Sequence, residues 1–361
     1  MKFSEYQYIR PDMKEIEKQF LETISIVEKT TDLEEASLAF EAINKVRRTF
    51  STMESLVYVR HSINTNDEFY ESEQSFFDEN LPIYESYVNK LSIALVNCPL
   101  IKQLEAKYGK KLFDSIRTSL KTFKPEIIED LQEENKLVTK YDKLIASAKI
   151  EFDGKINNLA QMTPYLSSPE RRIRKDAETA VFRFFEEHVQ EFDTIYDSLV
   201  KLRDMIAKKL GFANYIPLGY ARLDRSDYND QMVANYRKQV YEDLVPVVKE
   251  IIEDKRKRLQ LDELKSYDLG LNFLSGNPKP KGNRQWQVDQ AKKMYHEMSK
   301  ETGEFIDFMI DHELMDLDAK PGKRGGGYCT YFNDFKSPFI FANFNGTSGD
   351  VDVLTHEAGH A

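Results

Sequence analysis

The chain has 361 residues, of which 41% are hydrophobic and 31% are charged, and its formal net charge at pH 7 is −10. This composition is that of a globular protein and excludes the disordered and fibrous classes. The acidic balance argues against nucleic acid as a partner, because binding to phosphates relies on clustered positive charge. A chain of this length can bury a sizeable core in about two domains.

The sequence favours a cytoplasmic protein. Its two cysteines, Cys98 and Cys329, cannot form a disulfide framework, which fits a reducing compartment. The N-terminal residues lack the apolar segment of a signal peptide. No stretch approaches the ~18 uninterrupted apolar residues of a membrane span, so we expect no membrane partner.

Amphipathic helix is the dominant pattern up to about Leu264. The first predicted helix has apolar residues every three or four positions, which places them on one face: Ile16, Phe20, Ile24 and Val27. Asp12 and Glu15 predict a capping box at its start, and Thr31 with Glu34 predicts a second one. The pattern predicts a mainly α fold.

Prolines mark two further positions in the helical region. Ser168 and Pro169 predict an N-cap followed by the first helical residue. Pro246 falls inside the apolar repeat of a later helix and should kink or split it, because proline clashes with the preceding turn.

Glycine and proline become frequent at residues 270–282, which we interpret as a loop and as the main boundary of the chain. We therefore divide the chain into a helical domain at 1–269, a linker at 270–284 and a second domain at 285–361. Helices are predicted at about 288–297 and 301–312.

The last forty residues have a different character. Residues 326–332 and 338–344 are rich in aromatic and β-compatible residues, and a turn at 333–337 separates them, which predicts a β-hairpin. Cys329 is interpreted as a small buried strand residue. Residues 345–350 then lead into a final helix that contains the most informative motif of the chain.

His356-Glu357-Ala358-Gly359-His360 is an H-E-x-x-H sequence. On a helix, His356 and His360 lie on one face, where both imidazoles can reach a single Zn²⁺. Glu357 is placed to take a proton from water at the metal. Close packing on the far side of the helix would explain the small Ala358 and Gly359. The alternative is a helix whose two histidines bind no metal.

Other candidates have simpler explanations. His312-Glu313 is interpreted as an ordinary helix ending, and the remaining histidines as surface or satisfied residues: His61, His188 and His296. The basic runs 171–175 and 255–258 lie among acidic neighbours, so we interpret them as solvated helix faces rather than as nucleic-acid patches.

The segments 325–330, 338–347 and 356–360 together resemble oligoendopeptidase F and its thimet-oligopeptidase-like relatives. The helical region around Tyr267-Asp268-Leu269 and the stretch 313–317 are also similar to that family. The resemblance is specific over the second half of the chain, whereas the first half resembles the family only in its general pattern.

The resemblance implies a helical bowl or clamp around a deep channel, with residues 1–269 forming much of the wall and a small sheet beside the zinc helix. It implies a zinc endopeptidase that cleaves short unstructured peptides internally. By the family pattern His356 and His360 are zinc ligands, Glu357 is the general base, and the peptide path includes Gly326, Gly327, Tyr328, Asn345 and Gly346. Glycines and an exposed strand edge suit an extended peptide.

In this family the third zinc ligand is a glutamate on a following helix, and catalytic zinc normally takes three protein ligands plus water. No residue up to Ala361 matches that glutamate. We therefore expect residues 285–361 to be the front part of a catalytic domain, inactive alone, with the remaining portion in the same chain or a second chain. The alternative is a non-catalytic helical peptide-binding or scaffold protein.

Overall fold

Helices form most of the protein, which the computed structural model describes over residues 1–225 and 227–361. The first group of helices is α1 (Met13–Lys29), α2 (Leu33–Ile63), α3 (Glu68–Asn97), α4 (Ile101–Tyr108), α5 (Lys110–Ser119) and α6 (Ile128–Ala146). Helices α1, α2 and α3 pack on one another, and α6 packs on α3.

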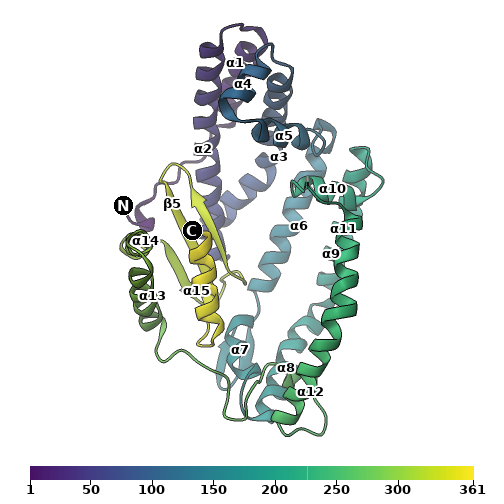
Figure 1. The fold of residues 1–361 in the computed structure, drawn as a ribbon, viewed down its shortest axis with the longest axis vertical. Helices are drawn as coiled ribbons and strands as arrows, with labels where there is room; N and C mark the ends of the chain where they lie inside the picture. Colours follow the sequence, from purple (N-terminus) through teal and green to yellow (C-terminus); the bar gives the residue numbers. More distant parts are fainter. Residues whose placement is uncertain (226) are drawn as a thin grey trace.

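The second group follows a short hairpin, β1 (Ile150–Phe152) with β2 (Lys155–Asn157). It comprises α7 (Leu159–Leu166), α8 (Arg171–Glu187), α9 (Val189–Lys209), α10 (Tyr215–Arg222), α11 (Asp230–Gln239) and α12 (Val245–Arg258). Figure 1 shows α1, α4 and α5 at one end of an elongated molecule, α7, α8 and α12 at the other, and α6 and α9 between them. The predicted mainly α fold is confirmed.

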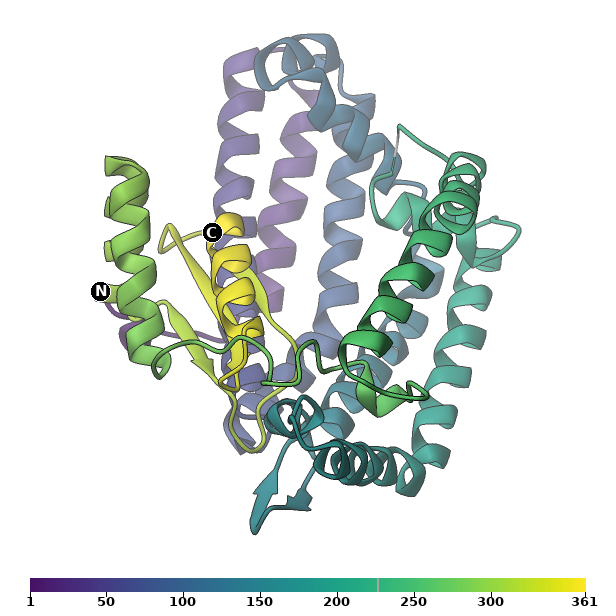
Figure 2. The same ribbon diagram turned by 60° about the horizontal axis from the view of Figure 1, so that its bottom comes forward.

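The chain ends in a smaller layer around a three-stranded sheet. It contains α13 (Arg284–Met298), α14 (Lys300–Asp311) and α15 (Gly349–His360), with β3 (Met315–Asp318), β4 (Tyr328–Phe332) and β5 (Ser337–Phe344). The sheet order is β3-β5-β4. Figure 2 shows α15 lying across these strands, and its packing against β5 and β4 fixes the position of the H-E-x-x-H residues.

The predicted hairpin is confirmed, since β4 and β5 are antiparallel from the Tyr328–Phe341 pair to the Phe332–Ser337 pair. Strand β3, which runs parallel to β5, was not predicted. His312 does cap the end of α14, as expected for a helix ending. Strand β3 is only four residues long, which is too short to give a clear strand pattern in the sequence. It also pairs with β5, whose residues lie more than twenty positions away, so no local pattern predicts the pairing.

The observed helix N-caps match the predicted ones where the predicted cap residue is an aspartate. Asp12 accepts hydrogen bonds from the backbone N–H groups of Lys14 and Glu15, which confirms Asp12 as the N-cap of α1, although the reciprocal bond from the Glu15 side chain that a capping box requires is not formed. The second predicted cap is wrong by one residue, because Asp32 rather than Thr31 accepts the backbone N–H of Glu34. A charged acceptor at the next position displaces the neutral hydroxyl.

The start of α8 is also later than predicted, since the helix begins at Arg171 rather than at Pro169. The guanidinium of Arg174 donates hydrogen bonds to the carbonyl oxygens of Ser168 and Pro169, at 2.7 and 3.1 Å. These carbonyls are thereby held in an extended segment outside the helix. Ser168 still accepts a hydrogen bond from the backbone N–H of Glu170.

The helix that contains Pro246 is interrupted as predicted. A π-helical segment, Val240–Leu244, joins α11 to α12 just before this proline, so the regular α pattern is lost there. Residues 269–283 contain no helix or strand, which agrees with the predicted loop. The division into domains at this loop stays a prediction.

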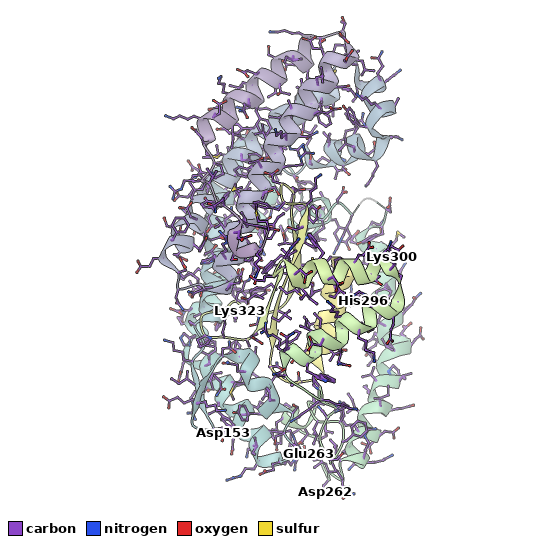
Figure 3. All side chains as sticks on the ribbon, turned by 90° about the vertical axis from the view of Figure 1, so that its left-hand side faces the viewer. Asp153, Asp262, Glu263, His296, Lys300 and Lys323 are labelled. Carbon is purple, nitrogen blue, oxygen red and sulfur yellow. The ribbon has the colours of Figure 1, made fainter. Side chains whose placement is uncertain are left out.

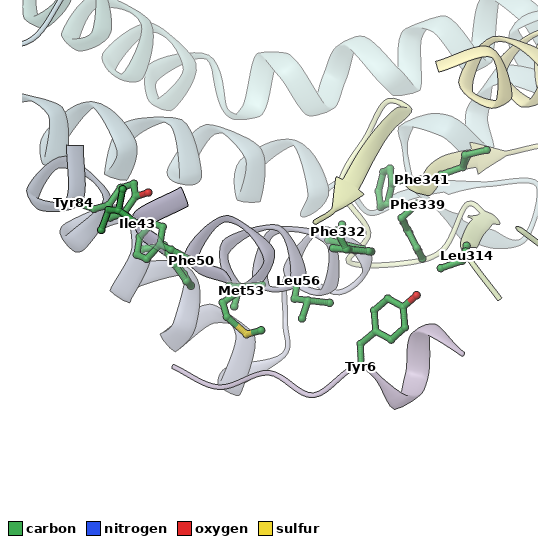
Figure 4. Packing of buried hydrophobic residues seen from close by; sticks show 14 of the residues in the cluster. Tyr6, Ile43, Phe50, Met53, Leu56, Tyr84, Leu314, Phe332, Phe339 and Phe341 are labelled. Carbon is green, nitrogen blue, oxygen red and sulfur yellow. The ribbon is translucent and has the colours of Figure 1, made fainter. Parts of the chain in front are cut away.

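The main hydrophobic core unites the N-terminal helices with the sheet (Figure 4). Phe50 and Leu56 of α2 belong to the same buried cluster as Phe332, Phe339 and Phe341 of the strands. The N-terminal residues fasten this junction, since the Tyr6 hydroxyl lies 2.7 Å from Ser337 Oγ. The sheet beneath α15 is therefore built on the first sixty residues of the chain.

Lys323, labelled in Figure 3, anchors the segment between β3 and β4. Its fully buried ammonium donates hydrogen bonds to Asp316 Oδ1 at 2.6 Å and to the carbonyl oxygens of Asp318 and Ala342. Burial lowers the pKa of Lys323 to about 8. These contacts fix the path by which the chain enters β4.

Candidate active site

Helix α15 brings the two histidines of the motif together at the surface. The Nε2 atoms of His356 and His360 lie 3.1 Å apart, and their ring planes are inclined by 82°. Two nitrogen ligands of one tetrahedral zinc ion, each about 2.0–2.1 Å from the metal, are about 3.3 Å apart. The two imidazoles thus have the chemistry and nearly the spacing of a pair of ligands.

Glu357 lies about 100° around α15 from His356, on the adjacent and more enclosed face of the helix, and is 7% exposed. Its carboxylate lies near Gly327, the residue that precedes β4: a Cβ atom at that position would lie 3.7 Å from Glu357 Oε1. It would also lie 3.3 Å from Val353 Cγ1 and 3.4 Å from the Phe341 carbonyl oxygen. The contact between strand and helix therefore depends on glycine at this position.

The motif faces a hollow of about 560 Å³. Its lining residues come from the end of α15 and from β4 and its neighbours: Gly327, Tyr328, Cys329, Thr330, Tyr331, Pro338, His356, Glu357, His360 and Ala361. Because β4 is an edge strand of its sheet, its outer backbone groups can pair with another extended chain.

Five of the predicted site residues meet in this hollow, namely Gly327, Tyr328, His356, Glu357 and His360. The Tyr328 ring is largely buried, stacked on Phe341 at 4.7 Å and close to the Tyr58 ring. Burial raises the pKa of its hydroxyl. Gly326 precedes the hollow, has φ +90°, and its carbonyl oxygen accepts a hydrogen bond from Asn343 Nδ2.

The other two predicted residues lie at the opposite end of α15. Asn345 and Gly346 donate their backbone N–H groups to the buried carboxylate of Asp350, at 2.9 and 2.8 Å. The Asn345 side chain also reaches Ala160 of α7, at 3.0 Å. These residues shape the turn into the H-E-x-x-H helix and do not line the hollow with Glu357.

Arg324 is a residue of this region that the sequence analysis did not single out. Its guanidinium forms an ion pair with Asp142 of α6 at 3.0 Å and a hydrogen bond to the Tyr58 hydroxyl of α2. Its backbone N–H donates to Ser62, and its carbonyl accepts from Asn343. Arg324 thus holds residues 325–327 against α2 and α6. No local sequence pattern predicts this contact.

The interpretation of His61 and His296 as residues with satisfied side chains is confirmed. His61 pairs with Glu71 at 2.8 Å, and His296 pairs with Asp307 at 3.0 Å. Two other predictions, for Cys329 and Gly359, are not borne out. Cys329 is half-buried rather than buried, and it lines the hollow; burial, and then the nearby Glu357 charge, raise the pKa of its thiol. Gly359 does not pack closely, since a Cβ there would meet nothing within 4 Å.

The solvated-face interpretation is wrong for Arg174 of the first basic run, whereas no residue of the second run is buried. Arg174 is only 2% exposed because it pairs with the buried Asp268 at 2.6 Å. In the second run Lys255 and Arg258 donate to carbonyl oxygens of Leu269 and Asn272, at 2.6 and 2.8 Å. Both runs hold loops in place, which requires partners that are distant in sequence.

Replacing Gly327 by a larger residue should disturb the packing of this segment against α15 and β5. We expect Gly327→Val to lower the free energy of unfolding by about 1–3 kcal/mol, because its branched side chain would overlap Val353 and the β5 backbone. Urea unfolding measures this change. Gly359→Ala is the matched control: it adds a methyl group on α15 in open space and should leave stability unchanged or slightly higher.

Comparison with known proteins identifies the chain's family. Residues 3–123 match the family model for the peptidase M3 N-terminal domain, and residues 164–361, more than half of the chain, match peptidase family M3. The chain belongs to peptidase family M3. The resemblance to oligoendopeptidase F is confirmed, since a curated relative of that name matches at 24% identity and solved structures of candidate members match at 51% and 48%.

The M3 chain is similar to PZ peptidase A, solved with an inhibitor, with 53% identity and a TM-score of 0.99 over 100% of this chain and 64% of that one. A candidate oligoendopeptidase F from Bacillus anthracis gives 48% identity and a TM-score of 0.98, over 66% of its length. The chromosomal oligoendopeptidase F of Lactococcus lactis is 24% identical over 196 residues, which span 54% of this chain and 31% of that protein.

The M3 chain therefore spans less than two thirds of the length of PZ peptidase A. In the part that the structure describes, no group of three or more His, Cys, Asp or Glu side chains is arranged to hold a metal ion. Over the same residues, no helix is both long and apolar enough to cross a membrane.

Proposed function

We propose that this M3 chain carries part of the active site of a zinc endopeptidase that hydrolyses internal bonds of short, unstructured peptides. The observation that carries the proposal is the convergence of the His356 and His360 Nε2 atoms beside the buried Glu357 and the open edge of β4. Membership of a peptidase family supports it.

His356 and His360 would hold the zinc ion through their Nε2 atoms. Zinc, when bound, polarises the scissile carbonyl and makes water a usable nucleophile near neutral pH. Glu357 accepts the proton of the attacking water and passes it to the leaving amine. Its partly enclosed position between α15 and β4 favours one orientation of the carboxylate, which this proton transfer needs.

The substrate would lie along β4 as an added strand, because this edge is unpaired within the sheet and borders the hollow. Gly326 and Gly327 would allow the peptide backbone to approach closely. Asn345 and Gly346 would contact the peptide farther from the histidines, near the start of α15. Only a narrow, extended chain would enter the deep channel that we propose between the helical walls.

A third ligand is needed for catalysis, since catalytic zinc takes three protein ligands. We propose that it is a glutamate outside residues 1–361, in the same polypeptide or a second chain; the greater length of PZ peptidase A is consistent with this. On this proposal residues 1–361 alone do not hydrolyse peptides. The unpaired Cys98 and Cys329 favour a cytoplasmic location.

Zinc content tests the ligand assignment. The polypeptide expressed from its own gene should bind one zinc per chain, and His356→Ala should remove that zinc, as measured by elemental mass spectrometry on desalted protein. His296→Ala is the control, because its ring pairs with Asp307 far from the motif. Unchanged zinc in His356→Ala would refute the assignment, and peptide binding that persists with chelator but without cleavage would favour the scaffold alternative.

A further inference from the structure

Residues 325–327, here called the glycine segment, are an exposed stretch of backbone beside the proposed site. They directly precede β4, the edge strand that borders the hollow. Gly326 has φ +90°, in the region that glycine adopts more easily than other residues. A run of glycines has no side chains to pack, so left free it would sample many conformations. The residues on either side must therefore fix its path.

Asn343 of β5 holds the glycine segment to the sheet. Its side-chain amide donates hydrogen bonds to the carbonyl oxygens of Arg324 and Gly326, at 2.9 and 2.8 Å. The strand pairing of β4 with β5 begins immediately afterwards, at Tyr328. The attachment to the sheet, and with it the position of Gly327 beside Glu357, therefore does not depend on the side chain of Arg324.

The Arg324 side chain holds the same segment to the helices. Its guanidinium forms an ion pair with Asp142 of α6 at 3.0 Å and donates a hydrogen bond to the Tyr58 hydroxyl of α2. Its backbone N–H donates to the Ser62 carbonyl oxygen at 2.8 Å. One arginine thus connects the glycine segment to two helices that are distant in sequence.

A cavity of about 210 Å³ lies between α2, α3 and α6 beside this arginine. Arg324 lines it together with Tyr58, Ser62 and Asp142. A void removes the packing contacts that would otherwise hold a side chain in place. The connection on this side of the glycine segment therefore depends on the polar contacts of Arg324 rather than on apolar packing.

We propose that Arg324 is a positioning residue for peptide binding: by tying the glycine segment to α2 and α6, it holds the exposed backbone groups of that segment in one conformation with which an extended peptide can pair. The inference rests on the proposed function, since that function places the peptide along β4 and these glycines. A backbone ordered before binding loses less conformational entropy when the peptide binds. The H-E-x-x-H residues are placed by α15, so Arg324 should affect peptide affinity rather than turnover.

Peptide affinity measured without catalysis tests this role. The polypeptide expressed from its own gene is treated with EDTA, and titration calorimetry with a short unstructured peptide gives Kd. We expect Arg324→Met to raise Kd by about tenfold or more, because ordering the freed segment would then oppose binding. Arg203→Met is the matched control and should leave Kd unchanged. Arg203 also pairs with α6, through Glu134 at 2.7 Å, and its side chain is 34% exposed against 25% for Arg324.

Two further readouts separate positioning from a general loss of stability. Asp142→Asn should raise Kd by about threefold or more in the parent protein but not further in Arg324→Met, because both substitutions remove the same ion pair. Hydrogen exchange should become faster at residues 325–328 in Arg324→Met and stay unchanged in α15. With zinc restored, KM should rise in parallel with Kd, while kcat stays close to that of the parent protein.

Faster exchange at residues 325–328 with an unchanged Kd would overturn the proposal, and so would a fall in kcat alone. If Arg324→Met does not fold, Tyr58→Phe replaces it, since it removes only the hydroxyl that accepts from Arg324. A parental Kd in both Tyr58→Phe and Asp142→Asn would then overturn the proposal.

Neither Kd nor hydrogen exchange depends on hydrolysis. Cleavage by the parent protein together with an unchanged Kd in Arg324→Met would retain the proposed function and reject this inference. Weaker binding in Arg324→Met, in a parent protein that binds peptides but does not cleave them, would reject the peptidase function and retain Arg324 as a positioning residue.

Discussion

Glu357→Gln should lower kcat for a short quenched peptide by about 10² or more in the polypeptide that carries the complete site, with zinc content unchanged. Glutamine keeps the size and shape of the side chain between α15 and β4, so the fold and the two imidazoles stay in place. It cannot accept the proton of the attacking water. Steady-state kinetics and elemental analysis of the same preparation measure both quantities.

Glu313→Gln is a suitable control, because Glu313 is an exposed residue that pairs with Lys2 outside the hollow. It should leave both kcat and zinc content unchanged. Turnover that persists in Glu357→Gln would exclude Glu357 as the general base. Loss of zinc together with activity would instead show that Glu357 supports the metal site rather than proton transfer.

Asp268→Ala should lower the free energy of unfolding by about 3–5 kcal/mol, since it leaves a buried guanidinium without its partner. Asp268 is fully buried and accepts hydrogen bonds from Arg174 at 2.6 Å and from Arg171 at 2.8 Å. It also accepts the backbone N–H of Lys265 at 3.0 Å. This carboxylate joins the start of α8 to the chain that follows α12. Urea unfolding at pH 7 measures the loss.

The same carboxylate predicts a pH dependence. Burial opposes its ionisation, but the hydrogen bonds from Arg171, Lys265 and Arg174 prevail and lower the pKa of Asp268 to about 2, from 3.8. A lowered folded-state pKa gives stability that is present above about pH 4 and is lost as pH falls toward 2, on the order of 2 kcal/mol.

Asp268→Asn should remove this acid dependence, so that the variant and the parent protein converge in stability as pH approaches 2. Asp262→Asn, at an exposed position of the nearby loop, should behave like the parent protein at every pH. Urea midpoints measured between pH 6 and pH 2.5 make the comparison. A constant difference between parent and Asp268→Asn across that range would contradict the assignment.

The sequence predicted the elements whose signals are local. Asp12 caps α1, the β4–β5 hairpin follows two runs of aromatic and β-compatible residues, and Pro246 lies next to an irregular turn. Strand β3 was missed because four residues carry too little pattern, and its pairing with β5 is long-range. The cap at Thr31 was wrong because Asp32, one residue later, competes with a stronger acceptor.

The sequence by itself determined that the two histidines of the H-E-x-x-H motif meet, because the i, i+4 spacing of His356 and His360 on any helix brings their imidazoles together. Only the tertiary structure decided the surroundings of that motif. It placed Glu357 against Gly327, buried the Tyr328 ring between two aromatic neighbours, and moved Asn345 and Gly346 to the other end of α15. It also joined Arg174 to Asp268 across 94 residues. These contacts depend on how distant segments pack, which helical and strand periodicity does not encode.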